Sequence, residues 1–401
     1  MTRRVVVTGM GCITPAGATV ERFAEAVFTG RSGIAEHAFA DLPEGRTSGL
    51  KFTRTAQVRG FVPDDHLTPT QVMGTERSSQ FALVAAAQAM AQARWAYPGG
   101  RIAVVLGCST GGRTWEEPET AKLYLSNARV HPLTVVRSMA SSGTSQVAMA
   151  HRITGPAFNL STACASGTHA IGMAFHMVRS GLVDAAITGG HEAPLTWGFL
   201  RAWDSMRVVS PTQCRPFAKD RDGMTLGEGA AMLCLEERES ALARGATVLG
   251  EIAGFGMSSD ASHITQPDPA GAASAMQAAL ADAGISPEEI GYVNAHGTGT
   301  IANDAVEAEA LRCIFGERGV AVSATKAVTG HSIGATGALE AVATILALHQ
   351  GRAPFTAGLV EPDEALGLDL VLREPRLLVQ QYALSNSLAF GGLNAILCFR
   401  R

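Results

Sequence analysis

The sequence predicts an α/β protein whose core consists of two halves with the same order of elements. Short apolar runs rich in Val and Ile alternate with Ala-rich stretches of helical length, as is typical of α/β folds. A strand, an Ala-rich helix and a second strand are expected near residues 4, 80 and 102, and the same order recurs near residues 252, 272 and 292. The irregular spacing predicts a duplicated domain with insertions and not a solenoid.

The individual elements follow from the same patterns. Strands are predicted at 4–8, 102–107, 158–161, 185–189, 230–235, 252–256, 292–295, 320–323, 383–387 and 395–399. Helices are predicted at 79–95, 164–179, 272–283 and 332–349. We place the boundary between the halves near Gly250, which gives domains at 1–250 and 251–401. Two polar, Pro- and Gly-containing insertions, roughly 30–75 and 110–150, predict surface loops or a cap that faces a partner.

Composition excludes several classes of protein. The 401 residues are 46% hydrophobic with a net charge of −4, so nothing indicates binding to nucleic acid or to an anionic membrane. Seven scattered cysteines without a C-x-x-C pair argue against a disulfide framework and a structural zinc site, and favour a reducing compartment. Because no apolar run approaches the ~20 residues that span a bilayer and the first aliphatic run is too short for a signal peptide, we expect a soluble, cytoplasmic protein.

Cys164 is the first candidate for chemistry. It lies in Ser-Thr-Ala-Cys-Ala-Ser-Gly, where an apolar strand gives way to an apolar helix. A cysteine at such a helix N-terminus meets unpaired backbone N–H groups and the positive end of the helix dipole, which favour the thiolate and can bind an oxyanion. The alternative is a cysteine that only fills space in the core.

Two histidines in Gly-rich settings, His296 and His331, are the next candidates. Two neutral imidazoles that donate N–H to one carbonyl oxygen would stabilise an enolate. Buried structural histidines and metal ligands are the alternatives, but no i, i+4 pair or H-E-x-x-H motif supports a metal, and none is expected. Lys326 precedes His331 by five residues and could pair with Glu340, unless it is simply exposed.

Phe390 begins a Phe-Gly-Gly segment just before the last strand. This segment could be an ordinary turn. It could equally be a movable gate beside an oxyanion-binding N–H.

With these residues in this order, the chain resembles the β-ketoacyl-acyl-carrier-protein synthases, and in particular the type II elongating ketosynthases of the thiolase superfamily. The resemblance implies a duplicated, five-layer α-β-α-β-α core and usually a dimer. It implies that Cys164 takes an acyl chain from an acyl carrier protein, and that His296 and His331 bind a malonyl thioester and assist its decarboxylation. The backbone N–H groups of Cys164 and Phe390 would then form the oxyanion hole. Four residues are expected to support the site: Lys326, Glu340, Asp304 and Glu307. No resident cofactor is implied, because the phosphopantetheine arrives on the carrier protein.

The chain departs from the family pattern around the expected acyl pocket. The usual ending Asn-Ser-Phe-Gly-Phe-Gly-Gly-Thr-Asn reads Asn-Ser-Leu-Ala-Phe-Gly-Gly-Leu-Asn here, which puts Leu388, Ala389 and Leu393 in place of an aromatic residue, a glycine and a threonine. Thr110 stands where an aliphatic pocket residue is usual. The basic run that docks the carrier protein is thinned, and it leaves Arg77, Arg129 and Arg207.

These departures, and a segment at 193–207 similar to nodulation-type and type II polyene ketosynthases, predict a specialised pathway with a chain-length-factor-like partner. A housekeeping fatty-acid ketosynthase homodimer and a non-catalytic partner subunit remain alternatives. A degradative thiolase would use a second cysteine near the C-terminus as base, and His331 with Phe390-Gly-Gly argues against it. A papain-like hydrolase would need a local signature that is absent around Cys164.

Overall fold

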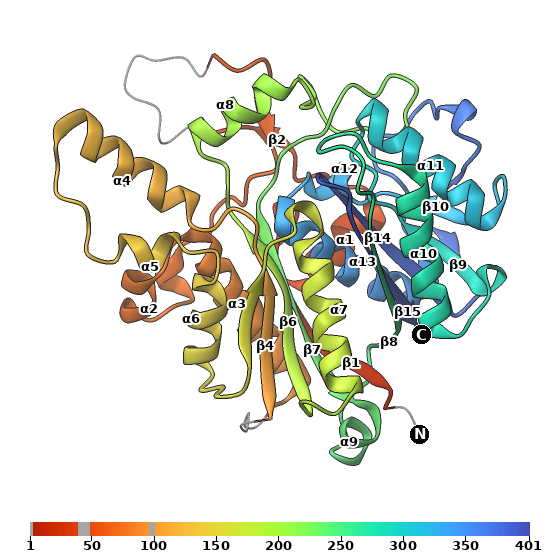
Figure 1. Cartoon of the computed structure of the whole chain (residues 1–401), viewed down its shortest axis with the longest axis horizontal. Coiled ribbons are helices and arrows are strands. Elements are labelled where there is room, and N and C mark those ends of the chain that lie inside the picture. The colour runs from red at the N-terminus through yellow and green to blue at the C-terminus, as the bar shows by residue number, and fades with distance from the viewer. Residues whose placement is uncertain (1–2, 39–48, 96–100) are drawn as a thin grey trace.

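The computed structural model describes residues 3–38, 49–95 and 101–401, so residues 39–48 of the predicted 30–75 insertion lie outside it. Within the described chain, one large sheet has the strand order β12-β10-β9-β14-β15-β8-β1-β7-β6-β4-β5 (Figure 1). Its strands are β1 (Val5–Ile13), β4 (Ile102–Gly107), β5 (Ala157–Leu160), β6 (Ala185–Glu192), β7 (Gly229–Glu237), β8 (Gly250–Ser259), β9 (Ile290–Asn294), β10 (Ala321–Ser323), β12 (Asp369–Leu370), β14 (Tyr382–Ala389) and β15 (Leu393–Arg400). Two small two-stranded sheets pair β2 (Ala35–Glu36) with β3 (Arg54–Thr55) and β11 (Arg352–Ala353) with β13 (Arg376–Leu377).

The strand order repeats itself. The series β1-β7-β6-β4-β5 in the first half corresponds to β8-β15-β14-β9-β10 in the second. The directions correspond as well, because β4 and β9 each run parallel to both neighbours while β1–β7 and β8–β15 are antiparallel. The two series join where Val5–Val7 of β1 pair with Gly250–Ile252 of β8. The predicted duplicated α/β core is confirmed.

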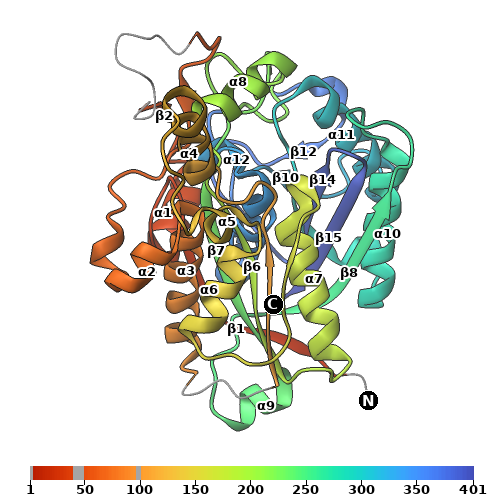
Figure 2. The same ribbon diagram turned by 60° about the vertical axis from the view of Figure 1, so that its left-hand side comes forward.

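Helices form the remaining layers of the core. Helices α7 (Ser166–Arg179; Figure 2) and α13 (Thr336–Gln350; Figure 1) contact each other and contact strands of both halves. Outside the first half lies α3 (Arg77–Ala93), and outside the second lies α10 (Pro269–Ala283) with α11 (Ile301–Phe315) beside it. This is the α-β-α-β-α order. The central position of α13 explains its mainly apolar sequence, since every residue from 336 to 348 is buried, Glu340 included.

The prediction of loops at 110–150 is wrong, because this insertion is mainly helical. It forms α4 (Arg113–Ser126), α5 (Thr134–Ser138) and α6 (Ser142–Ala150), and α4 and α5 project from one side of the molecule in Figure 1. Helix α4 contains Pro118 and buries only Glu119, so its sequence lacks the apolar stripe by which a helix is recognised. The other helices outside the prediction are α1 (Val20–Thr29), α2 (Pro69–Gly74), α8 (Trp197–Met206), α9 (Arg238–Ala243), α11 and α12 (Lys326–Thr329). Among the described residues, none of the helices has the length and apolar character needed to cross a bilayer.

Candidate active site

Cys164 lies on a sharp turn between β5 and α7, as the sequence predicts. A single 3-10 turn (Ala163–Ala165) leads directly into the helix, and Ala163 adopts a left-handed conformation with φ of 49°. The Ser166 hydroxyl accepts from the Thr162 N–H (2.9 Å) and donates to the Ala163 carbonyl (2.7 Å). Such a turn presents the cysteine side chain at the start of a buried helix, next to free N–H groups.

The second half of the chain repeats this turn close to His331. A 3-10 turn (Ile333–Ala335) leads into α13, and Ile333 has φ of 45°. His331 lies just before the turn, and its backbone is fixed by hydrogen bonds to Thr225 and Gly227. The Thr336 hydroxyl is 2.9 Å from His331 Nδ1, which leaves Nε2 to face the active site.

His296 lies in the loop between β9 and α11, and two buried carboxylates of α11 hold this loop. Glu307 accepts the N–H groups of His296 (2.7 Å) and Gly297 (2.8 Å), while Asp304 accepts the N–H of Gly299 (3.1 Å). Both carboxylates are fully buried and face the loop backbone. The predicted supporting residues Asp304 and Glu307 therefore shape the loop that carries His296.

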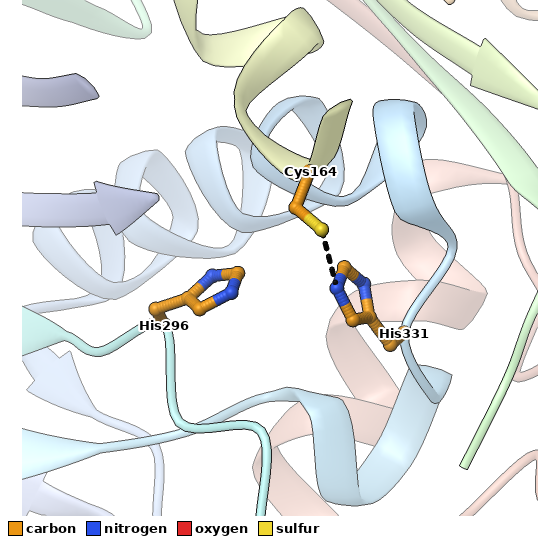
Figure 3. A group of neighbouring side chains, drawn as sticks. All are labelled: Cys164, His296 and His331. Atoms are coloured by element: carbon orange, nitrogen blue, oxygen red, sulfur yellow. Dashed lines mark hydrogen bonds between the residues drawn. The ribbon is translucent and has the colours of Figure 1, made fainter. Parts of the chain in front are cut away.

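The thiol and the two imidazoles meet at one point (Figure 3). His331 Nε2 is 3.1 Å from Cys164 Sγ, and the His296 ring stands nearly perpendicular to the His331 ring with centroids 5.4 Å apart. One ligand-type atom from each of the three residues lies within 4.8 Å of the others. The three side chains come from segments far apart in the sequence: the β5–α7 turn, the β9–α11 loop and the segment before α13. They therefore come together only when both halves of the core are folded.

Burial determines the protonation of this group. It raises the pKa of Cys164 to about 11, although the Lys326 ammonium and the backbone N–H groups of Phe390 and Cys164 act in the opposite direction. The backbone N–H groups at the helix start therefore favour the thiolate, as the sequence predicts, but the desolvation of the buried sulfur raises the pKa by more than they lower it. Burial and the nearby Lys326 hold the pKa of both histidines well below the usual range, so both imidazoles are neutral, as expected.

Lys326 is completely buried, which excludes the exposed alternative. Its Nζ donates to Glu340 Oε1 (2.6 Å) and to the His296 carbonyl, and it lies 3.1 Å from His296 Nδ1. An ammonium only donates, so Nδ1 of His296 must accept. The single proton of the neutral His296 ring is then on Nε2, as assigned from this network. Lys326 thus turns His296 into an N–H donor toward the cavity, which does not suit metal binding.

Phe390 opens the turn between β14 and β15, and it lines the cavity that contains the thiol. The turn continues through Gly391 and Gly392, whose φ angles of 83° and 70° favour glycine. The predicted pocket residues Leu388 and Ala389 line the same cavity. Thr110 does not: its hydroxyl is directed to Glu192 (2.6 Å) instead.

Glu192 is a buried residue that the sequence interpretation missed. Its carboxylate accepts the N–H groups of Ser109 (2.8 Å), Thr110 (3.0 Å) and Gly334 (3.1 Å). It therefore ties the loop after β4 to the turn before α13. The one available signal was its place directly after Gly189-Gly190-His191, where a buried strand ends.

The three predicted docking arginines differ in their surroundings. Arg77 forms an ion pair of 2.7 Å with buried Glu228 and lies over the Phe81 ring, so its charge is already compensated within the chain. Arg129 and Arg207 are exposed. Only these two remain candidates for contact with a carrier protein.

The duplicated core, the thiol at a helix start and the two neutral imidazoles define the thiolase-like ketosynthases, a class of condensing acyltransferases. The chain belongs to the β-ketoacyl synthase family: residues 2–241 match the model of the β-ketoacyl synthase N-terminal domain, and residues 249–359 match that of the C-terminal domain. It is thus a β-ketoacyl-acyl-carrier-protein synthase by family.

Individual relatives cover the whole chain. It is 40% identical to nodulation protein E of Rhizobium meliloti (strain 1021), over 100% of both chains. It is 39% identical to 3-oxoacyl-[acyl-carrier-protein] synthase 2 of Staphylococcus aureus (strain COL), over 100% of this chain and 98% of the relative. Among solved structures, the ishigamide ketosynthase/chain length factor matches with a TM-score of 0.94 and 33% identity, over 100% of this chain and 99% of the other.

Proposed function

We propose that Cys164 carries the growing acyl chain and that His296 and His331 drive a decarboxylative condensation on it. The observation that carries this proposal is the thiol–imidazole contact of 3.1 Å with the second imidazole facing it. In the first step, Cys164 Sγ attacks the thioester of an acyl carrier protein while its proton passes to His331 Nε2. That proton then goes to the departing carrier thiolate, so the acyl group and one proton exchange places.

The oxygen that becomes negative in this step needs donors. The backbone N–H groups of Cys164 and Phe390 both act on Cys164 Sγ and lower its pKa, which supports a role for them beside the carbon under attack. Preorganised N–H groups of this kind stabilise the oxyanion of a tetrahedral intermediate.

In the second step a malonyl thioester loses CO₂. The electrons of the broken C–C bond form an enolate, whose oxygen accepts N–H bonds from His296 and His331. The Thr336 hydroxyl can donate or accept at Nδ1, so His331 is able to serve first as base and then as donor. The enolate carbon attacks the acyl thioester, and the released Cys164 thiolate takes up a proton. The products are CO₂ and an acyl chain longer by two carbons on the carrier.

The substrates come on a carrier protein, and we propose that no cofactor resides on this chain. One similar structure, with a TM-score of 0.90 and 27% identity, is described as a type II polyketide synthase acyl-carrier protein in complex with its ketosynthase. By analogy, the phosphopantetheine arm of an acidic carrier would reach Cys164 while the carrier contacts the exposed Arg129 and Arg207. A cytoplasmic location fits such a soluble partner.

We propose a second ketosynthase-fold subunit as the stable partner. Strand β5 forms one edge of the large sheet, and an edge strand offers unpaired N–H and C=O groups. In the same half of the chain, the projecting helices α4 and α5 expose Tyr124 (82%), Leu125 (86%) and Val135 (72%). Exposed apolar surface of this kind is typical of a protein–protein interface. Two similar structures are described as ketosynthases with a chain length factor.

We further propose a specialised pathway, such as polyene or polyunsaturated acyl synthesis, with a chain-length-factor-like partner. The changes at Leu388 and Ala389 support it, because both line the cavity that holds Cys164. The alternative is housekeeping fatty-acid elongation by a homodimer, and the relatives of both kinds are about equally identical to this chain. The presence of Cys164, His296 and His331 in one group argues against a non-catalytic partner subunit.

The test is incubation of the full chain, alone and with candidate partner subunits, with acyl-loaded and malonyl-loaded carrier proteins, followed by intact-protein mass spectrometry. Wild type should gain the acyl mass, and Cys164→Ala should not. His331→Ala should still gain acyl mass but form no condensed product. Acylation of Cys164→Ala at the same site, or normal condensation by His331→Ala, would refute the corresponding assignment.

A further inference from the structure

Trp203 of α8 stacks on Phe390, the first residue of the turn between β14 and β15. The rings of Trp203 and Phe390 are nearly parallel, with an angle of 17° and centroids 5.8 Å apart. Phe199, one turn earlier on α8, contacts Trp203 with centroids 6.0 Å apart. Trp203 therefore joins helix α8 to the turn between β14 and β15.

Helix α8 provides a fixed support for this tryptophan. Glu117 of α4 accepts the Thr196 hydroxyl (2.5 Å) and the Gly198 N–H (2.6 Å) at the start of α8. Near its end, Asp204 accepts the N–H of Lys51 (3.2 Å). Leu200, between these two hydrogen-bonded ends, is completely buried. It belongs to an apolar cluster that includes Ile333, in the turn before α13. The helix is thus held at both ends and in the middle.

The backbone of the Phe390 turn is held from another direction. The Gly391 N–H donates to the Ile264 carbonyl (2.8 Å), and the Asp260 N–H donates to the Gly392 carbonyl (2.9 Å). These bonds fix the main chain but do not involve the Phe390 side chain. Because that side chain lines the cavity of Cys164 and is only partly buried, its stack on Trp203 determines where the ring rests.

We propose that Trp203 is a positioning residue that holds the Phe390 ring at the cavity and thereby sets how fast a reagent or an acyl chain reaches Cys164. Its application to acyl chains rests on the proposed function. The shielding of the thiol stands on the geometry alone. A stacked aromatic pair has a modest free energy, so its loss should change the rate of access about twofold to tenfold.

The experiment measures alkylation of Cys164 by iodoacetamide, followed by peptide mass spectrometry of the full chain. Trp203→Leu keeps an apolar side chain but removes the stack, and it should react about twofold to tenfold faster than wild type. Trp203→Phe keeps a ring and should react at nearly the wild-type rate. Exposed Cys313 serves as an internal reference that should not change. Phe199→Leu is the matched control on the same helix, since it removes a ring that touches Trp203 and not Phe390, and it should have the smaller effect.

Two further variants separate positioning from a general loosening of α8. Phe390→Leu removes the same stack from the other side and should raise the alkylation rate as Trp203→Leu does, which keeps the test valid if Trp203→Leu fails to fold. In a Phe390→Ala background, Trp203→Leu should cause no additional increase. An additional increase there, or a wild-type rate in folded Trp203→Leu and Phe390→Leu, would overturn the proposal.

Alkylation requires neither carrier protein nor acyl group, so its result does not depend on the proposed function. Loading of the same variants from acyl carrier proteins of different chain length tests the consequence for catalysis. If the Trp203 variants are alkylated faster but wild type itself gains no acyl group, the proposed acyl-carrying role of Cys164 is refuted. The positioning role of Trp203 then still holds.

Discussion

The buried pair of Lys326 and Glu340 gives the sharpest prediction for stability. Their side chains are 0% and 1% exposed and 2.6 Å apart, so removal of the ammonium leaves a carboxyl group without its charge partner in the core. Loss of one member of a buried pair costs about 3–5 kcal/mol. We therefore expect Lys326→Met to unfold at a clearly lower urea concentration, and Lys326→Met with Glu340→Gln to recover much of the loss.

The pH dependence of this loss has a defined sign. Burial raises the pKa of Glu340 above its ordinary value of 4.5, and Lys326 opposes this rise. Without Lys326 the folded-state pKa rises further above the unfolded value, so the folded variant binds the proton more tightly. Its stability is then highest at acidic pH and falls as the pH increases. Urea unfolding at pH 5 and pH 8 measures this. A single variant as stable as wild type at pH 8, or a double variant no better than the single one, would refute the reasoning.

Three further predictions concern the thiol, the His296 loop and the partner surface. Because only the thiolate reacts and burial raises the pKa of Cys164 to about 11, its alkylation rate should climb about tenfold per pH unit from neutral pH toward pH 10, and a plateau below pH 9 would contradict this. Glu307→Ala orphans two buried N–H groups at about 1–3 kcal/mol each, and it should lower both the unfolding midpoint and condensation, whereas exposed Glu309→Ala on the same helix should not. Leu125→Asp with Val135→Asp should reduce the mass measured by analytical ultracentrifugation. Val379→Asp, at an equally exposed position, should leave it unchanged, and an unchanged mass in the double variant would exclude this surface as the interface.

The sequence predicted those parts of the fold whose burial leaves a periodic pattern. The strand at 102–107 matches β4 residue for residue, and α13 was found because most of its residues are apolar. Helix α4 was missed because a helix that buries one residue shows no apolar stripe. The division at residue 250 stays a prediction.

Residue types in the sequence were enough to find the candidate site. They did not predict the pKa of its thiol or all of its hydrogen bonds. Cys164, His296 and His331 were assembled from their local glycine and helix contexts, and the structure brings them together. The sequence shows the N–H groups of the helix N-terminus, which lower the pKa of Cys164, but it does not show how much solvent is excluded around the sulfur, which raises that pKa. Thr110 was assigned to the pocket because nothing local reveals that Glu192, 82 residues later, takes its hydroxyl.

The repeated turn at Ala163 and Ile333 has a consequence for how many acyl groups one chain can hold. In the second copy of the turn, Gly334 is the residue equivalent to Cys164. A Cβ atom there would come within 2.6 Å of Glu192 Oε2 and 2.8 Å of the Ser109 nitrogen. The duplicate therefore has no space for a second sulfur. Of the two equivalent positions in the duplicated turn, Cys164 alone has room for a thiol, so under the proposed function each chain holds one covalently bound acyl group.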